Sequence, residues 1–331
     1  MPEFRQNFAT KEWVIIATER ARRPDTFRHS QRERKNPPPF DPQCPFCPGN
    51  EDKTPAAVFQ INDDGGWALR AVPNKYAALA EDLGTQRTHE GLFLRAGGYG
   101  IAEVIIETPA HDQNPATMGR ESIRNVVLAY RNRYTDISLH EKVELITVFR
   151  NHGSRAGTSL EHPHSQVIAT PITPPHVRDQ IYQARISYDT FGSCIYCDML
   201  AEEIRQQERI IMENDNFVAY CPFASRSPFE ARIIPKLHRG SFGNINDEEV
   251  NAFSHILQEV LKKIYTGLGD PDYNFIIRSA PVQDSNVKHY HWYTVIVPRL
   301  TTPAGFEMGT GIYINVSYPE QCARFLRELS T

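Results

Sequence analysis

An internal repeat in the order of its motifs most constrains the fold of this 331-residue chain. Each half contains a Cys-x-x-Cys pair, two apolar strand patterns, a single histidine, a helix pattern, a further strand pattern and a His-x-His. In both halves 51 residues separate the single histidine from the His-x-His: His111 from His162, and His238 from His289. The spacing of eight residues between a preceding glutamate and that histidine is the same in both halves as well, from Glu103 to His111 and from Glu230 to His238. We therefore expect a duplicated structural unit.

Hydrophobic periodicity predicts the same kinds of element in each half. Apolar residues at helical spacing after residue 120 and again after residue 250 predict two amphipathic helices. Short apolar runs predict strands at 13–17, 67–72, 103–107, 143–149, 217–221, 230–234, 273–278 and 312–316. A helix over 177–188 bridges the halves, and a last helix has Pro319 in its first turn. The proline-rich stretch 170–175 divides the chain into predicted domains 1–172 and 173–331.

Composition excludes several classes of protein. The net charge is −4, from 36 Lys and Arg against 40 Asp and Glu, and no basic arm is present, which argues against a nucleic-acid partner. No apolar run reaches the roughly 18 residues of a membrane span, and the first residues lack the pattern of a signal peptide. We therefore expect a soluble cytoplasmic protein. Six cysteines, four of them in Cys-x-x-Cys pairs, indicate metal or thiol chemistry in a reducing compartment.

Each half supplies a candidate zinc site. Two thiols and two imidazoles are the composition of a closed tetrahedral zinc site, and the first half provides Cys44, Cys47, His111 and His162. By the repeat, the second half provides Cys194, Cys197, His238 and His289. Neither set has an open position, so both Zn²⁺ ions are predicted to be structural. Redox-active cysteines are the alternative, but a thioredoxin-type pair opens a helix directly after a strand, and the prolines around the first pair favour a metal-binding turn.

The His-x-His of the first half extends into His-Pro-His-Ser-Gln, residues 162–166. Side chains two apart on an extended segment point to the same side, so one imidazole held by zinc and one free imidazole face a common site. Neutral His164 is a competent nucleophile toward phosphorus, and Gln166 can donate a hydrogen bond to a phosphoryl oxygen. In the second half, aromatic residues follow His291 instead. We expect one working site and, at His291, a packed or metal-adjacent imidazole.

These features resemble those of the galactose-1-phosphate uridylyltransferase family, the transferase branch of the histidine-triad superfamily. The resemblance covers nearly the whole chain. It rests on the duplication, the Cys-Pro-Phe-Cys pair, His-Pro-His-x-Gln with a serine three residues before it, and Gly-Phe-Glu near the C-terminus. It implies an α+β fold of tandem histidine-triad-like domains, each an antiparallel sheet with packed helices, of which the second has a degenerate active site.

The resemblance also implies a role for each matching residue. His164 is the nucleophile, and Gln166 and Ser159 contact phosphoryl oxygens. The family's Arg-x-x-Arg-Pro, which holds the sugar phosphate, matches Arg20 and Arg23; on sequence alone such an arginine run is more typical of a solvated face. The remaining contacts, two near the nucleotide and one to the hexose, match Asn74, Asn151 and Glu307.

The implied reaction is a ping-pong exchange of UMP between a UDP-hexose and a hexose 1-phosphate through uridylyl-His164. The family also suggests a homodimer in which the segment around Glu307 completes the neighbour's site. Ser165 stands where the best-known family motif has glycine, as in related adenylyl-transferring phosphorylases, and Tyr313 stands where glutamine is common. An ADP-sugar phosphorylase is therefore the first alternative, and a non-catalytic nucleotide-binding zinc protein is the second.

Overall fold

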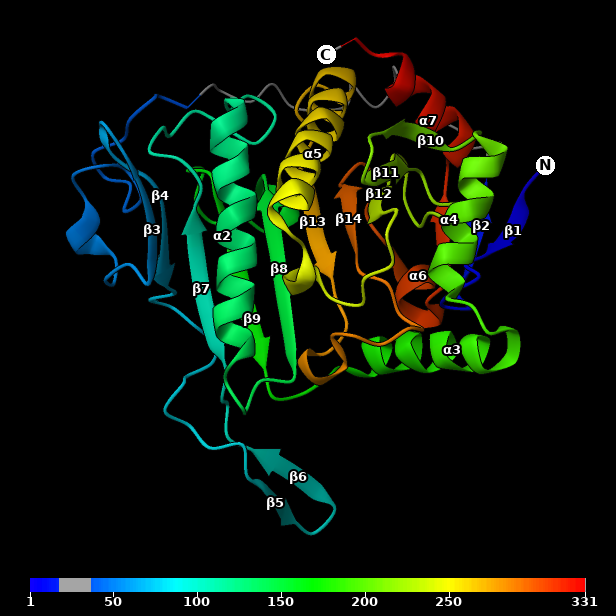
Figure 1. Ribbon diagram of the computed structural model, residues 1–331, viewed down its shortest axis with the longest axis horizontal. Helices are drawn as coiled ribbons and strands as arrows, with labels where there is room; N and C mark the ends of the chain where they lie inside the picture. Colours follow the sequence, from blue (N-terminus) through cyan, green and yellow to red (C-terminus); the bar gives the residue numbers. More distant parts are fainter. Residues whose placement is uncertain (18–36, 331) are drawn as a thin grey trace.

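A ten-stranded antiparallel sheet forms the centre of the computed structural model, which describes residues 1–17 and 37–330 (Figure 1). In spatial order its strands are β10 (Ile210–Glu213), β11 (Phe217–Tyr220), β12 (Ala231–Pro235), β14 (Tyr293–Pro298), β13 (Tyr273–Arg278), β8 (Leu145–His152), β9 (His164–Thr170), β7 (Ile101–Ile106), β4 (Gly66–Pro73) and β3 (Phe59–Asp63). Every neighbouring pair in this sheet is antiparallel.

The sheet consists of two halves with the same connectivity. Read outward from the centre, β8, β9, β7, β4 and β3 correspond to β13, β14, β12, β11 and β10. Helix α2 (Arg120–Ser138) connects β7 to β8, and helix α5 (Asp247–Leu268) connects β12 to β13. The halves join at the centre, where Asn151 on β8 pairs with Asn274 on β13. This order confirms the predicted α+β fold, and it shows that the two units share one continuous sheet.

Helices α2 and α5 lie side by side on one face of this sheet (Figure 1). The apolar positions that predicted α2 are all buried beneath it, including Val126, Val127 and Tyr130. Helix α5 begins with a capping box between Asn246 and Glu249, which satisfies backbone N–H groups of its first turn. The side chains under both helices form a single apolar cluster with members from both halves. The duplicated units are therefore joined by a shared core as well as by a shared sheet.

The opposite face differs between the halves. In the second half, α3 (Pro175–Phe191) and α4 (Ile195–Gln206) contribute to a second apolar cluster that includes Tyr196, Tyr290 and Tyr293. Tyr196 stacks on Tyr293 with ring centroids 5.6 Å apart. Cys194 is the N-cap of α4, so the second Cys-x-x-Cys opens a helix rather than forming the turn found at the first pair. It follows α3 and not a strand, unlike the thioredoxin arrangement.

Smaller elements surround the sheet. The strands β1 (Glu3–Gln6), β2 (Trp13–Ile16) and β15 (Tyr313–Asn315) form a separate sheet in which β2 and β15 are parallel. A hairpin of β5 (Arg87–Glu90) and β6 (Phe93–Ala96) projects from the body (Figure 1). Among the residues that the structure describes, the remaining helices are α6 (Gly305–Thr310) and α7 (Pro319–Glu328). The 3-10 turns of the same part of the chain are η2 (Glu51–Lys53), η3 (Ser154–Ala156), η4 (Phe242–Asn244) and η5 (Val282–Asp284).

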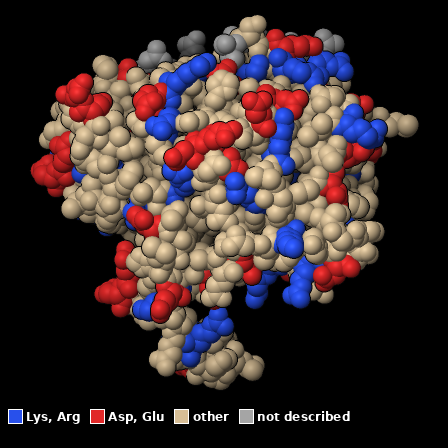
Figure 2. Space-filling model, in the orientation of Figure 1, with Lys and Arg blue, Asp and Glu red and all other residues tan. Residues whose placement is uncertain are grey.

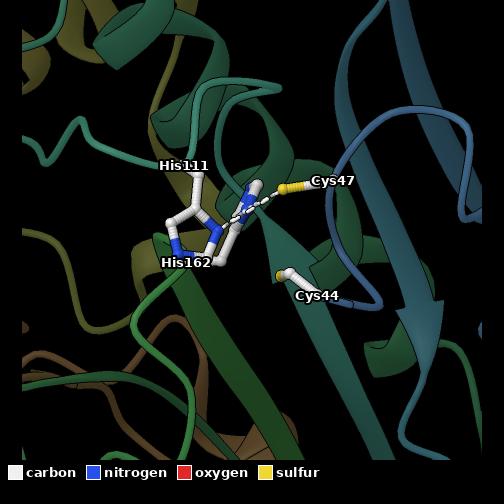
Figure 3. A group of neighbouring side chains, drawn as sticks. All are labelled: Cys44, Cys47, His111 and His162. Carbon is white, nitrogen blue, oxygen red and sulfur yellow. Dashed lines mark hydrogen bonds between the residues drawn. The ribbon is translucent and has the colours of Figure 1, made fainter. Parts of the chain in front are cut away.

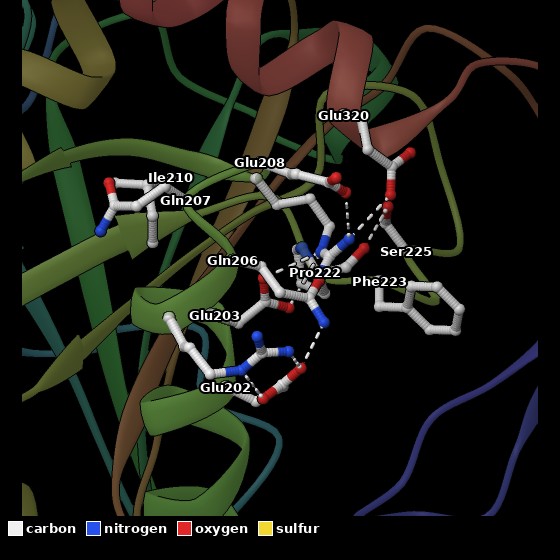
Figure 4. A network of polar contacts seen from close by, with 12 residues as sticks. Glu202, Glu203, Gln206, Gln207, Glu208, Ile210, Pro222, Phe223, Ser225 and Glu320 are labelled. Atoms are coloured by element: carbon white, nitrogen blue, oxygen red, sulfur yellow. Dashed lines mark hydrogen bonds and ion pairs between the residues drawn. The ribbon is translucent and has the colours of Figure 1, made fainter.

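An ion-pair network links Glu203 of α4 to Glu320 of α7 (Figure 4). Arg5 of β1 also joins this network. Arg209 donates to both carboxylate oxygens of Glu203, at 3.1 and 2.8 Å, and to Glu320 at 2.9 Å. Arg5 donates to the same Glu320 oxygen at 2.8 Å. The N-terminal strand, the C-terminal helix and the helix after the second cysteine pair are thus fixed to one another.

Acidic and basic side chains both occur across the face shown in Figure 2. This mixture is in keeping with the near balance of charges in the sequence. None of the helices among the described residues combines the length and the apolarity that crossing a membrane requires.

Candidate active site and metal centres

Four buried side chains from distant parts of the first half converge at the end of β7 and β9 (Figure 3). Their donor atoms all lie within 4.8 Å of one another, and the residues are Cys44, Cys47, His111 and His162. The cysteines belong to a tight turn in which backbone N–H groups of Phe46 and Asp41 donate to the two sulfur atoms. Such donors stabilise thiolates, which are the form that binds a metal.

The spacing of these atoms matches a tetrahedral zinc site. The Nδ1 atoms of His111 and His162 are 3.3 Å apart, and the Sγ of Cys47 lies 3.4 and 3.6 Å from them. Ligands on a tetrahedral zinc, at about 2.0–2.1 Å for nitrogen and about 2.3 Å for sulfur, lie roughly 3.3 Å apart for two nitrogens and roughly 3.6 Å apart for sulfur and nitrogen. The four residues therefore fit Zn²⁺, which would tie the cysteine turn to the histidine strand.

The tautomer of His162 agrees with this assignment. Its Nε2–H donates to the carbonyl oxygen of Thr108 at 2.8 Å, which leaves the Nδ1 lone pair free for a metal. Burial lowers the pKa of His162 to about 4, so the ring stays neutral. Phe46 packs edge-on against His162 and also against His164, with ring centroids 6.0 and 5.5 Å away. Phe46, which lies between the two cysteines, thus contacts both a predicted metal ligand and the predicted nucleophile.

His164 is the first residue of β9 and is 7% exposed. Its Nδ1–H donates to the carbonyl oxygen of His162 at 2.8 Å, so the lone pair is on Nε2. Burial lowers the pKa of His164, and the positive charge of buried Arg150 lowers it further by a smaller amount. A neutral imidazole with a free Nε2 is the form required of a nucleophile.

The other predicted active-site residues of the first half occupy three different positions. Gln166 lies two residues along β9 from His164, on the same side of the strand, and is partly exposed. Asn151 is the penultimate residue of β8 and accepts a hydrogen bond from Asn274 at 2.6 Å. Ser159 is exposed in the loop between η3 and β9.

The remaining predicted contacts come from other parts of the chain. Asn74 follows β4, is partly exposed, and accepts from the backbone N–H of Tyr76 at 3.0 Å. Glu307 lies on α6, which packs against β15, and its carboxylate accepts from the backbone N–H of Ala304 at 2.9 Å. The predicted clamp residues Arg20 and Arg23 fall outside the described residues.

The second metal cluster contains three of its four predicted ligands. The donor atoms of Cys194, Cys197 and His238 lie within 4.8 Å of one another. Cys197 Sγ is 3.3 Å from His238 Nδ1, and His238 Nε2–H donates to the carbonyl oxygen of Val287 at 3.1 Å, an arrangement like that of His162. Two thiols and an imidazole suit Zn²⁺ as well.

The ring of His289 is not part of this cluster, contrary to the prediction from spacing. The carbonyl oxygen of His289 accepts from Cys194 Sγ at 3.6 Å. Instead, the ring of His291 packs against that of His238 with centroids 5.1 Å apart, as His162 packs against His111 at 5.2 Å. His291 is completely buried, so the expectation of a packed imidazole is confirmed.

Strand register explains the difference. Val104 and Ala231 are equivalent by spacing, since each stands seven residues before its histidine. Val104 pairs with Gln166, 62 residues later, whereas Ala231 pairs with Ile296, 65 residues later. The pairing of β12 with β14 is therefore displaced by three residues, which moves the His-x-His relative to His238.

Sequence reasoning missed a buried polar group behind β9. Glu107, Arg150, Tyr130 and Ser165 hydrogen-bond to one another on the side of the sheet covered by α2. The available signal was a charged residue beside apolar strand residues, as in Val-Ile-Ile-Glu and Val-Phe-Arg. Lys, Arg, Asp and Glu are seldom fully buried unless they are paired.

Comparison with known proteins identifies the family. A model described as galactose-1-phosphate uridyl transferase, N-terminal domain, matches residues 1–174, and a domain of unknown function matches residues 119–331. The ADP-glucose phosphorylase of Arabidopsis thaliana is 36% identical over 99% of this chain and 93% of its own length. The chain belongs to the galactose-1-phosphate uridylyltransferase family. The family resemblance predicted from the motifs is thereby confirmed.

Other members of the family agree with this assignment. The galactose-1-phosphate uridylyltransferase of Thermotoga maritima is 30% identical over 99% of this chain and 98% of its own length. A crystal structure of the Arabidopsis thaliana ADP-glucose phosphorylase with bound ADP-glucose superposes with a TM-score of 0.85 at 33% identity, covering 100% of this chain and 99% of that one. The family consists of nucleotidyltransferases of carbohydrate metabolism that act on nucleotide sugars and sugar phosphates.

Proposed function

We propose that this protein transfers a nucleotidyl group from a nucleoside-diphosphate sugar to a phosphate-bearing acceptor through a covalent intermediate on His164. The observation that carries this proposal is the state of that side chain. Its Nδ1–H is committed to the carbonyl oxygen of His162, so the free lone pair belongs to Nε2. A metal cluster of two cysteines and two histidines adjoins it, and Gln166 follows on the same side of β9.

The proposed chemistry has two half-reactions. In the first, Nε2 of His164 attacks the α-phosphorus, an N–P bond forms, and the P–O bond to the sugar phosphate breaks, which releases a hexose 1-phosphate. In the second, a phosphate oxygen of the acceptor attacks the same phosphorus and the N–P bond breaks. Gln166 and Ser159 stabilise the charged phosphoryl oxygens in both steps. The amide of Gln166 cannot act as a general base that activates water, which favours transfer over hydrolysis.

For the nucleotide we propose adenosine, with ADP-glucose as donor and inorganic phosphate as acceptor. Two observations support this choice. The Arabidopsis thaliana ADP-glucose phosphorylase shares more identity with this chain than the Thermotoga maritima uridylyltransferase, 36% against 30%. Ser165 also replaces the glycine of the uridylyltransferase motif.

Exchange of UMP between UDP-hexose and hexose 1-phosphate is the second candidate. It is supported by the family model over residues 1–174 and by curated uridylyltransferases that cover 99% of the chain. In either case Arg20 and Arg23 would hold the sugar phosphate. The proposal includes a homodimer in which Glu307 reaches the neighbour's hexose. Helix α6, which carries Glu307, packs against β15 of the separate three-stranded sheet, and this position is compatible with such a dimer.

Intact-protein mass spectrometry without an acceptor tests this function. The protein is mixed separately with ADP-glucose and UDP-glucose. A gain of one adenylyl group from ADP-glucose, absent in His164→Ala and discharged by inorganic phosphate, is the expected result. A gain of one uridylyl group from UDP-glucose alone, discharged by galactose 1-phosphate, would establish the second candidate. No adduct from either donor would overturn the proposed chemistry.

A further inference from the structure

A buried group of polar side chains lies directly behind the nucleophile. Glu107 follows β7 and is completely buried, and its carboxylate accepts hydrogen bonds from Arg150, Ser165 and Tyr130. The hydroxyl oxygens of Tyr130 and Ser165 lie 2.6 Å apart, so the single Tyr130 proton is shared between the serine oxygen and the carboxylate. Three donors around one carboxylate satisfy a charge that would otherwise be very costly to bury. We call these four residues the Glu107 network.

The Glu107 network contacts the backbone on both sides of His164. Arg150 Nη1 donates to the carbonyl oxygen of His164 at 3.0 Å. Ser165, the next residue, is bonded through its hydroxyl to Glu107. The backbone N–H of Glu107 donates to the carbonyl oxygen of Pro163, the preceding residue, at 3.1 Å. The three consecutive residues 163–165 are thus each attached to Glu107 or to its partner Arg150.

A second buried Arg–Glu pair on the same elements has no such contact. Glu103 lies on β7 four residues before Glu107, and Arg133 of α2 donates to both of its oxygens at 2.7 and 2.8 Å. Both residues are less than 10% exposed. Glu103 pairs across the sheet with Val167, beyond the His-x-His-x-Gln motif. This pair resembles Glu107–Arg150 in composition and burial but does not contact residues 163–165.

We propose that the Glu107 network is a positioning device for His164. This proposal rests on the proposed function, in which Nε2 must attack phosphorus in line with the leaving oxygen. Misplacement of a reacting group by about 1 Å can cost 10²-fold in rate. The backbone of His164 carries the imidazole, and Nδ1 is held by the neighbouring carbonyl of His162. Fixing residues 163–165 therefore fixes the direction in which Nε2 points.

Ser165 has a particular part in this proposal. The glycine found at this position in the best-known family motif has no hydroxyl, so it cannot make the bond to Glu107. In this chain the residue that follows the nucleophile is therefore attached to the strand behind it by a side chain. We assign Ser165, Glu107 and Arg150 as positioning residues that do not touch the substrate.

Matched double variants test the proposal. Glu107→Gln/Arg150→Met removes the ion pair behind His164, and Glu103→Gln/Arg133→Met removes the comparable pair elsewhere on β7. Rapid-quench kinetics measure the rate of adduct formation and the donor concentration at half-maximal rate. We expect the first variant to form the adduct 10- to 100-fold more slowly with that concentration changed by less than two-fold, and the second to keep the wild-type rate within two-fold. Ser165→Ala and Tyr130→Phe should slow the reaction less, and the conservative single variant Arg150→Lys should retain most of the rate.

Hydrogen exchange gives a second readout that does not depend on activity. Amides in peptides spanning residues 160–168 should exchange faster in Glu107→Gln/Arg150→Met than in the matched control, measured at equal distance below each unfolding temperature. Equal adduct rates and equal exchange in the two double variants would overturn the positioning role. If the wild-type protein forms no adduct, the proposed function fails, and the exchange data alone then decide whether the network orders residues 163–165. If Glu107→Gln/Arg150→Met does not fold, Ser165→Ala and Tyr130→Phe are measured instead, and wild-type rates and exchange in both would overturn the proposal.

Discussion

The two halves of the sheet have the same strand order, and each has a corresponding helix on one face, α2 or α5. They differ in what lies on the other face. In the first half, β9 carries His164 and the partly exposed Gln166. In the second half, the corresponding strand β14 begins with Tyr293, which is buried against Tyr196 of α4 and contacted by Arg232 at 4.3 Å from the ring centroid.

This difference shows how a duplicated unit can keep its fold while the side chains on one face of its sheet change. Packing under α2 and α5 involves the inward side chains of the strands and is common to both halves. The opposite side chains alternate with these, so they can change from polar to aromatic without altering the shared core. Aromatic residues bury large areas, and α4 packs on them in the second half. The following predictions test this contrast, from the largest expected effect to the smallest.

Removing the two histidines should affect catalysis very differently. His164→Ala eliminates the proposed nucleophile, so adduct formation should fall on the order of 10⁴-fold or more. His291→Gln, in the buried equivalent region, should leave the adduct rate within two-fold below its unfolding temperature. Rapid-quench assays of both variants measure this. A comparable loss in His291→Gln would contradict the division into one active and one inactive half.

Removing one thiolate from each cluster should release one structural zinc ion in each case and leave the other bound. Cys44→Ser should lose one of two bound zinc equivalents, and the unfolding temperature should fall by more than about 5 °C, because structural zinc contributes directly to folding. Cys197→Ser should lose the other equivalent while adduct formation continues below its unfolding temperature. Elemental analysis and calorimetry measure both effects. A buried cysteine outside the clusters, in Cys322→Ser, serves as the control and should keep both equivalents.

Opening the covered face should cost stability without restoring chemistry. Tyr196 is 1% exposed between Tyr290 and Tyr293, so Tyr196→Ala should cost about 3–5 kcal/mol of unfolding free energy. The adduct should remain at one group per chain. Tyr182→Ala on the exposed side of α3 is the matched control, with an expected change within about 0.5 kcal/mol. Denaturant unfolding and intact mass measure the two results, and a second adduct would refute this account of the inactive half.

The ion-pair network on α4 should make the free energy of unfolding weakly dependent on pH. Burial raises the pKa of Glu203 to about 6 despite the opposing charge of Arg209. The folded state therefore binds the proton more tightly than the unfolded state, so this group's contribution to stability is greatest below about pH 4.5 and falls, by at most about 2 kcal/mol, as the pH rises to about 6. Glu203→Gln should flatten that slope in denaturant titrations between pH 4.5 and 7.

A neighbouring glutamate provides the control for this measurement. Hydrogen bonding from Arg205 lowers the pKa of exposed Glu202 to about 2, so Glu202 is ionised throughout the range tested. Glu202→Gln should leave the slope unchanged. An equal slope in wild-type protein and Glu203→Gln would exclude the buried carboxylate as its source.

The sequence alone determined the duplication, the helices α2 and α5, several of the strands and the first metal cluster. Helical and strand periodicity follow from local geometry, so α2, α5 and these strands appear where the apolar spacing indicated. Cys44, Cys47, His111 and His162 were identifiable because zinc accepts few ligand types at restricted spacings. The division at residues 172 and 173 stays a prediction, since one sheet and one core span both halves.

Only the tertiary structure decided which residues meet across strands. Equal spacing of 51 residues predicted equal roles for His162 and His289, but strand register is set by packing and is displaced by three residues in the second half. The helix opened by Cys194 and the burial of Glu107 behind His164 likewise depend on contacts distant in sequence. Local sequence specifies which face of a strand a side chain occupies, whereas its neighbours there come from other strands and helices.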